Sequence, residues 1–198
     1  MFDRFLLKYA GEFRRYIRNR QFEVTPNGVV FPRAAAVANG MYFYDTNGAD
    51  PGESPNLLTD EGLIYLLSVG LNNGAKLSSW YLSLYAANYT PQAGLTAASY
   101  PATASEITSN TEGYTESTRP LWTPTSPTTP MLDNVANKVA YTIATASELV
   151  ITGAALLSEA TKGAVTGKCA SATKFPAPRT VYNTDVFNLA YRVQLTST

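Results

Sequence analysis

The sequence predicts a mainly β protein: an antiparallel β-sandwich or jelly-roll-like domain that follows an N-terminal amphipathic helix, a hairpin and a short helix. Several segments of the second half have the period-two alternation of strands. Turns containing glycine and proline separate these segments at a spacing typical of sandwiches and barrels. A chain of 198 residues that is 45% hydrophobic is also long enough to bury a substantial core.

The first twenty residues are predicted to form an amphipathic helix. Its apolar side chains recur at steps of three and four residues, and they are Phe2, Phe5, Leu6, Tyr9, Phe13, Tyr16 and Ile17. Residues 1–24 carry six basic side chains against three acidic ones. Three interpretations stay open: the apolar stripe packs on the β-domain, docks on an acidic protein surface, or lies on a membrane or nucleic acid.

A hairpin is predicted next, because Asn27-Gly28 separates two short apolar runs between residues 21 and 31. Residues 33–62 contain several turn-forming pairs and are expected to be mostly loop. One short aromatic strand, residues 41–44, interrupts that loop.

A short helix is predicted to begin after Thr59 and to end at Gly70. Threonine is a favourable N-cap, and the two acidic residues that follow it are well placed against the helix dipole. Asparagine and glycine at residues 72–74 break the pattern. We therefore predict an N-terminal arm and docking region over residues 1–74 and a β-sandwich domain over residues 75–198.

Five strands are predicted within the β-sandwich domain, and they are residues 80–85, 139–144, 148–157, 168–172 and 187–195. Between the first and second of these strands lies a stretch rich in Thr, Ser and Pro, residues 91–130. Its prolines cannot donate hydrogen bonds to a neighbouring strand. The stretch is either a solvated loop or an extended element that becomes ordered against a partner.

The composition argues against several chemistries. A single cysteine and no histidine exclude an internal disulfide and a Ser-His-Asp triad within this chain, and make a structural zinc site unfavourable. Residues 161–169 resemble a phosphate-binding loop, but three residues instead of four separate the glycines, so a hairpin turn is the better interpretation. The oxygen-rich residues 45–50 lack the spacing of an EF-hand and are explained by turns. We predict no catalytic residue, no metal and no cofactor.

The net charge of zero argues against nucleic acid and anionic membranes as partners. Apolar runs are shorter than the roughly 18 residues of a membrane span. The first residues mix charged with apolar side chains, which is unlike a signal peptide. The sequence therefore predicts a soluble protein of a cytoplasm.

Four segments and the closing strand resemble structural proteins of tailed-bacteriophage virions. The four segments are residues 74–85 (GAKLSSWYLSLY), 88–91 (NYTP), 114–122 (YTESTRPLW) and 153–163 (GAALLSEATKG). Together with the closing strand, the resemblance covers about residues 57–198. Within that class the chain is most similar to capsid cement, or decoration, proteins. Such proteins vary widely in sequence, and the acidic residues 45–61 have no counterpart in the pattern.

The resemblance implies a non-enzymatic protein that binds the outside of the capsid and clamps neighbouring subunits of the phage major capsid protein. It also implies a likeness to compact β-sandwiches, often homotrimers, that assemble in the host cytoplasm and end on the capsid surface. The predicted N-terminal helix then supplies the capsid-docking residues, which are Phe2, Phe5, Tyr9, Phe13, Arg14, Arg15, Ile17, Arg18 and Arg20. The alternative is a head-to-tail or tail-tip component whose β-domain binds a host-surface glycan.

Overall fold

The computed structural model describes residues 23–26, 28–30 and 36–197. It divides the chain into two units, residues 1–37 with 196–198 and residues 38–195. Among its described residues, the first unit contains the antiparallel pair β1 (Glu23–Thr25) and β2 (Gly28–Val30). This pair is the hairpin that the sequence predicts. The predicted helix over residues 1–20 lies outside the described residues.

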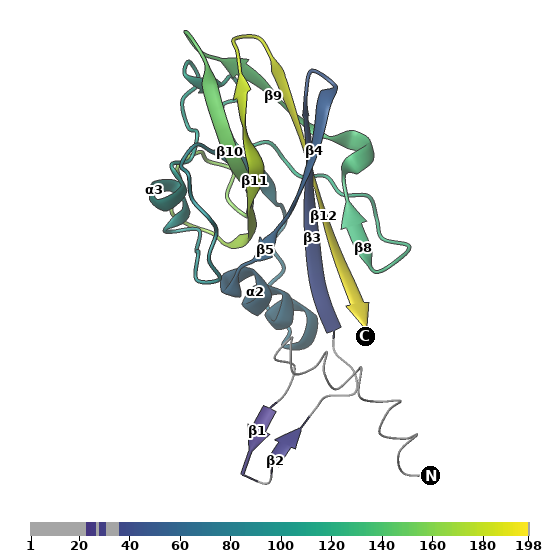
Figure 1. The fold of residues 1–198 in the computed structure, drawn as a ribbon. Helices are drawn as coiled ribbons and strands as arrows, with labels where there is room; N and C mark the ends of the chain where they lie inside the picture. The colour runs from purple at the N-terminus through teal and green to yellow at the C-terminus, as the bar shows by residue number, and fades with distance from the viewer. Residues whose placement is uncertain (1–22, 27, 31–35, 198) are drawn as a thin grey trace, which may run out of the picture. The chain divides into compact units, whose positions relative to one another are not determined.

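The second unit is a β-sandwich (Figure 1). One sheet has the strand order β5-β11-β10-β6, and the other has the order β4-β3-β12-β9-β7, with β8 paired to β12. The first sheet consists of β5 (Leu57–Leu58), β6 (Tyr81–Tyr85), β10 (Leu149–Leu157) and β11 (Cys169–Val181). The second consists of β3 (Ala36–Thr46), β4 (Ala49–Pro55), β7 (Gly113–Tyr114), β8 (Met131–Asp133), β9 (Val139–Ala144) and β12 (Val186–Ser197). The mainly β fold class is therefore confirmed.

Aromatic side chains from both sheets fill the core between them. The Tyr44 ring from β3 stacks on Phe175 from β11, with ring centroids 4.1 Å apart. Tyr42 lies 4.6 Å from Tyr191 of β12, and its hydroxyl hydrogen-bonds the Ser171 hydroxyl at 2.8 Å. Tyrosine suits this core because each ring contributes a large apolar area, and the Tyr42 hydroxyl also finds a buried partner.

The four-stranded sheet is covered on its outer face as well. A second buried cluster joins Tyr85, Leu157 and Cys169 of this sheet to Leu95 and Tyr100 of the following connection. The connection includes α3 (Tyr100–Ala104), which lies beside β10 in Figure 1. Because both faces of the sheet are covered, β10 is buried at every residue from 151 to 157.

The connection over residues 91–130 corrects both interpretations made from the sequence. It contains α3 and β7, and many of its side chains are buried within the chain's own fold. The Trp122 ring is one of them, and its indole N–H donates to the Asn134 side-chain oxygen at 3.0 Å. Most of the segment is therefore neither a solvated loop nor an element that requires a partner to become ordered. Its end, residues 123–130, is a largely exposed loop, as the prolines there predict.

Two predicted boundaries are wrong for a common reason. Residues 49–55 were expected to be loop but form β4, which tolerates its two prolines because it is an edge strand of the six-stranded sheet. The strand predicted to end near residue 172 continues through Pro176 and Pro178 to Val181. Its pairing with β10 shifts register between Ile151 and Gly153, and this irregularity accommodates the prolines.

The single cysteine, Cys169, is fully buried at the start of β11. Burial raises the pKa of its thiol to about 12, and the nearby Glu61 carboxylate acts in the same direction. We therefore expect no reaction of the folded protein with a thiol reagent such as Ellman's reagent at pH 8, because the thiolate is the reactive form. One equivalent should react after unfolding in guanidinium chloride, whereas fast stoichiometric reaction without denaturant would contradict the burial of this side chain.

Candidate interaction surface

The helix α2 (Asp60–Leu71) is held at its first turn by the four-stranded sheet. Thr59 is its N-cap, as predicted: the Thr59 hydroxyl accepts from the Gly62 N–H at 3.0 Å and donates to the Cys169 carbonyl. A Cβ added at Gly62 would come within 2.7 Å of the Ala170 Cα, so the helix approaches β11 as closely as only glycine allows.

The Glu61 carboxylate makes a second attachment at the same turn. It accepts hydrogen bonds from the backbone N–H groups of Cys169 at 2.7 Å and Ala97 at 2.9 Å. Lys168 lies 3.5 Å from its other oxygen. These contacts join the start of α2 to β11 and to the connection that covers the sheet, so the direction of the helix is set by its first turn.

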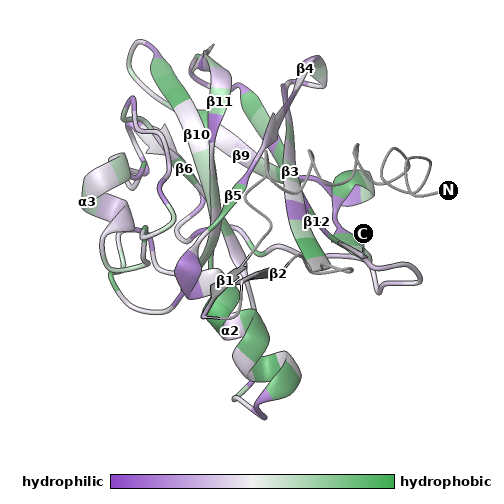
Figure 2. Cartoon of the chain, turned by 60° about the horizontal axis from the view of Figure 1, so that its bottom comes forward, coloured by the Kyte–Doolittle hydropathy of each residue, from purple (hydrophilic) through white to green (hydrophobic). Residues whose placement is uncertain are grey.

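Beyond this turn α2 presents apolar side chains to solvent. Gly62 is its only buried residue, in a helix that the structure describes throughout. We call the exposed apolar side chains the α2 stripe, and they are Leu63 (38% exposed), Ile64 (67%), Leu66 (47%), Leu67 (60%) and Leu71 (84%). Figure 2 shows α2 extending from the sandwich with green, hydrophobic residues along it. So many neighbouring exposed aliphatic side chains are typical of a surface that another molecule covers.

One flank of α2 is tied back to the chain. The Tyr65 ring meets Trp80 edge to face, with centroids 5.3 Å apart, and the Tyr65 hydroxyl accepts from the Leu77 N–H at 2.8 Å. The Gly74 N–H donates to the Ser68 carbonyl at 2.8 Å and closes the helix end. The helix is thus supported at both ends while the α2 stripe stays uncovered by the described residues.

The α2 stripe carries no charge. The sequence from residue 62 to residue 75 contains no acidic or basic side chain. Full burial of one Leu or Ile contributes about 1.5–3 kcal/mol, so covering the five partly exposed side chains contributes on the order of 5 kcal/mol. Association itself costs about 4–15 kcal/mol, so one such contact is weak, and several acting together are needed for lasting attachment.

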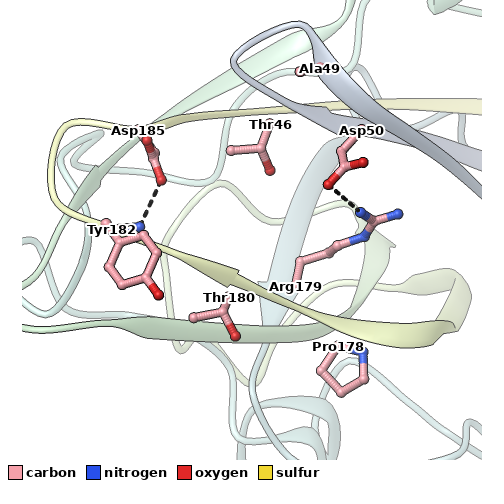
Figure 3. A pocket seen from close by; sticks show the side chains of 8 residues that line it. All are labelled: Thr46, Ala49, Asp50, Pro178, Arg179, Thr180, Tyr182 and Asp185. Atoms are coloured by element: carbon pink, nitrogen blue, oxygen red, sulfur yellow. Dashed lines mark hydrogen bonds and ion pairs between the residues drawn. The ribbon is translucent and has the colours of Figure 1, made fainter.

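A polar cleft of about 380 Å³ is the second candidate site (Figure 3). Its lining residues come from the β3–β4 turn and from the end of β11, and they are Thr46, Ala49, Asp50, Pro178, Arg179, Thr180, Tyr182 and Asp185. The Arg179 guanidinium lies 4.9 Å from the centre of the Tyr44 ring. Its ion pair with the exposed Asp50 carboxylate is long, at 3.9 Å. Its buried Nε has no hydrogen-bond partner.

The Asp185 carboxylate, another polar group of the cleft, is engaged in a turn. Asp185 accepts from the Tyr182 N–H and from the Asn47 side-chain amide, both at 2.8 Å, and these bonds lower the pKa of its carboxyl. The cleft therefore contains one partly available guanidinium and the exposed Tyr182 ring, but no arrangement of groups that would activate a nucleophile.

A buried ion pair holds the long connections on the sandwich. Arg119 and Glu106 form two hydrogen bonds of 2.7 Å, and both side chains are fully buried. Glu106 also accepts from the Ser83 hydroxyl at 2.8 Å and the Gly163 N–H at 3.0 Å, while Arg119 donates to the Glu159 carbonyl at 2.8 Å. Burial by itself lowers the pKa of Arg119, but the hydrogen bonds and charge of Glu106 raise it overall. Both charged groups therefore have hydrogen-bond partners within the fold, and we assign the pair a structural role.

The oxygen-rich residues 45–50 form the β3–β4 turn. The buried Asp45 carboxylate accepts from Lys138 at 2.6 Å, Asn188 at 2.7 Å and the Gly48 N–H at 2.9 Å. Burial opposes ionisation of Asp45, but these bonds lower the pKa of its carboxyl overall. Within the described residues no group of three or more His, Cys, Asp or Glu side chains could hold a metal.

The predicted capsid-docking residues, from Phe2 to Arg20, all lie outside the described residues, so the structure brings none of them to a site. Sequence reasoning identified α2 and its apolar face but not the exposure of that face. It also missed the meeting of Glu106 with Arg119, because nothing local in the sequence marks two residues thirteen positions apart as a buried pair.

Comparison with known proteins adds no relative. No protein family, curated protein or solved structure matches this chain. None of the described helices is long and apolar enough to cross a membrane. The α2 stripe and the cleft are therefore the two candidate sites that the described residues offer.

Proposed function

We propose that this chain is a non-enzymatic structural protein of a tailed-phage virion. It binds the outside of the capsid and clamps neighbouring subunits of the major capsid protein, and so stabilises the head. The observation that carries the proposal is the α2 stripe: five exposed aliphatic side chains on a helix whose first turn is anchored to the sheet. A rigidly presented apolar surface supports a role in assembly with other protein.

The weakness of a single contact through the α2 stripe also supports a clamp. A clamp holds by several attachments at once, and each attachment raises the effective concentration of the next. In this proposal the predicted N-terminal helix supplies further contacts on the capsid, with Arg14, Arg15, Arg18 and Arg20 facing acidic shell residues. The protein would be made in the host cytoplasm and end on the capsid surface.

A second candidate function is favoured by the cleft of Figure 3. In this alternative the chain is a head-to-tail or tail-tip component that binds a host-surface glycan. The exposed Tyr182 ring offers a stacking surface for a sugar, and Arg179 offers donors to its hydroxyl groups. The two functions differ in copy number, because a cement protein accompanies the whole shell whereas a tail component occurs in a handful of copies.

Purified particles test the proposed function. We expect the chain to copurify with the major capsid protein in comparable numbers, and its addition to particles that lack it should raise the temperature at which they release DNA. The Leu71→Glu variant should attach at least about tenfold more weakly, because a charge on the α2 stripe disrupts a contact between proteins on which the combined attachment depends.

The matched control is Val165→Glu, which places the same charge at a side chain 59% exposed in the β10–β11 connection. This variant should attach like the wild type. A handful of copies per particle, or attachment to isolated tails and glycan but not to shells, would contradict the capsid role and favour the second candidate.

A further inference from the structure

We propose that the α2 stripe packs against the α2 stripe of a second copy of this chain. The inference rests on the proposed assembly role and names the partner at that surface. A clamp that attaches to the shell at several equivalent points needs more than one copy of the chain. Pairing through α2 would join the copies and leave the rest of each copy free to contact the shell.

The spacing of the stripe suits a helix as its partner. Ile64, Leu67 and Leu71 are separated by three and four residues, which aligns them as a straight seam along one side of α2. These are the a and d positions of one heptad and the a position of the next, and Leu63 flanks the seam. Leu71, at the far end of the seam, is the most exposed of the three at 84%, against 67% for Ile64 and 60% for Leu67. The seam is therefore most open where the helix is furthest from its anchored first turn.

The absence of charge favours a copy of the chain over a different protein. Charged side chains at an interface mainly determine which partner binds. Residues 62–75 contain no charged side chain that could select a different protein. Two identical uncharged seams meet without like-charge repulsion, and a symmetric contact buries both at once. The anchored first turn keeps the seam in one orientation, so little conformational freedom is lost when the helices pair.

The mass of the full-length protein in solution tests this pairing. Light scattering and sedimentation equilibrium should show a mass that rises above that of the monomer with concentration, with a Kd of about 10–100 μM for so small a seam. Leu67→Glu should weaken association at least about 100-fold, because it places a charge in the centre of the apolar contact. Leu67→Met, which keeps the apolar volume, and Val165→Glu, which lies outside the stripe, should associate like the wild type.

Cysteine crosslinking locates the contact. The only native cysteine is buried, so a cysteine introduced at Leu71 provides the one accessible thiol among the described residues. Under copper-catalysed air oxidation, Leu71→Cys should form a covalent dimer, and the control Val165→Cys should form much less. Circular dichroism should show the same melting temperature for Leu67→Glu and the wild type at a concentration where both are monomeric.

A monomer mass at every concentration, or an oligomer that Leu67→Glu leaves intact, would overturn the inference. So would a Leu71→Cys crosslink that forms no faster than the Val165→Cys crosslink. A monomer that binds uncharged phosphatidylcholine vesicles through Leu67 would overturn it as well. The proposed function fails separately. An oligomer that depends on α2 but does not bind particles would contradict the capsid role and support this inference. A monomer that binds particles would contradict this inference and support the capsid role.

Discussion

Replacing Arg119 with methionine is expected to lower the free energy of unfolding by about 3–5 kcal/mol. The change leaves the Glu106 carboxylate fully buried without the two 2.7 Å hydrogen bonds and the positive charge that now compensate it. Two further attachments of the connections, from Arg119 to the carbonyls of Glu159 and Ala164, are lost at the same time. Urea unfolding followed by tryptophan fluorescence at pH 7 measures the difference.

The pH dependence of this variant should be diagnostic. Without Arg119, the buried Glu106 carboxylate opposes folding only while it carries its charge. The deficit relative to the wild type should therefore narrow as the pH is lowered into the acidic range.

The control for this prediction is Arg192→Met. Arg192 also bonds a carboxylate, Asp133 at 2.9 Å, but its side chain is 35% exposed. Loss of such a pair is expected to cost less than about 1 kcal/mol, because the remaining Asp133 carboxylate is 17% exposed to water and keeps its hydrogen bond from the Val135 N–H. Equal losses in the two variants would contradict the assignment of Arg119 and Glu106 as a buried structural pair.

Replacing Gly62 with alanine is expected to destabilise the fold by about 1–3 kcal/mol. Alanine in a helix is ordinarily more favourable than glycine, so the sign itself is informative. At Gly62 the new Cβ would meet the backbone of Ala170, which cannot rotate away as a side chain could. The first turn of α2 would have to move from β11, and the bonds from Thr59 and Glu61 would weaken with it.

Gly70→Ala is the matched control in the same helix. No atom lies within 4 Å of a Cβ added at Gly70, so this change should stabilise the protein by about 0.4–1 kcal/mol. Thermal unfolding of the two variants should therefore shift in opposite directions. A stabilising effect of Gly62→Ala would show that the helix does not depend on close contact with β11.

Local patterns predicted those elements whose formation depends mainly on residues near in sequence. The pairing of β1 with β2 and the Thr59 cap of α2 each join residues that lie within a few positions of one another in the sequence. Strand-like runs bounded by turns predicted β9 and β10, and period-two alternation predicted β12, each nearly to its observed ends. In β12 the alternating Phe187, Leu189 and Tyr191 are all buried, as that pattern predicts.

Elements that depend on distant neighbours were not predicted. The strand β4 contains two prolines and a glycine, and it is a strand only because β3 pairs with one of its edges. The polar connection over residues 91–130 is ordered because its scattered apolar side chains cover a sheet and because Glu106 meets Arg119. Composition alone favoured a solvated loop there, since the residues that bury it are far apart in the chain.

The properties of the candidate interaction surface also fall into those that the sequence predicts and those that only the tertiary structure decides. The sequence by itself determined that the chain is mainly β, that a short helix follows Thr59 and ends near Gly70, and that this helix has an apolar face, because periodicity and capping are local properties. Only the tertiary structure decided that the first turn of α2 is fastened to β11 while Leu67 and Leu71 stay in solvent. Exposure depends on which distant segments pack nearby. The sequence pattern of an apolar helical face is the same whether that face is buried in a core or exposed on the surface.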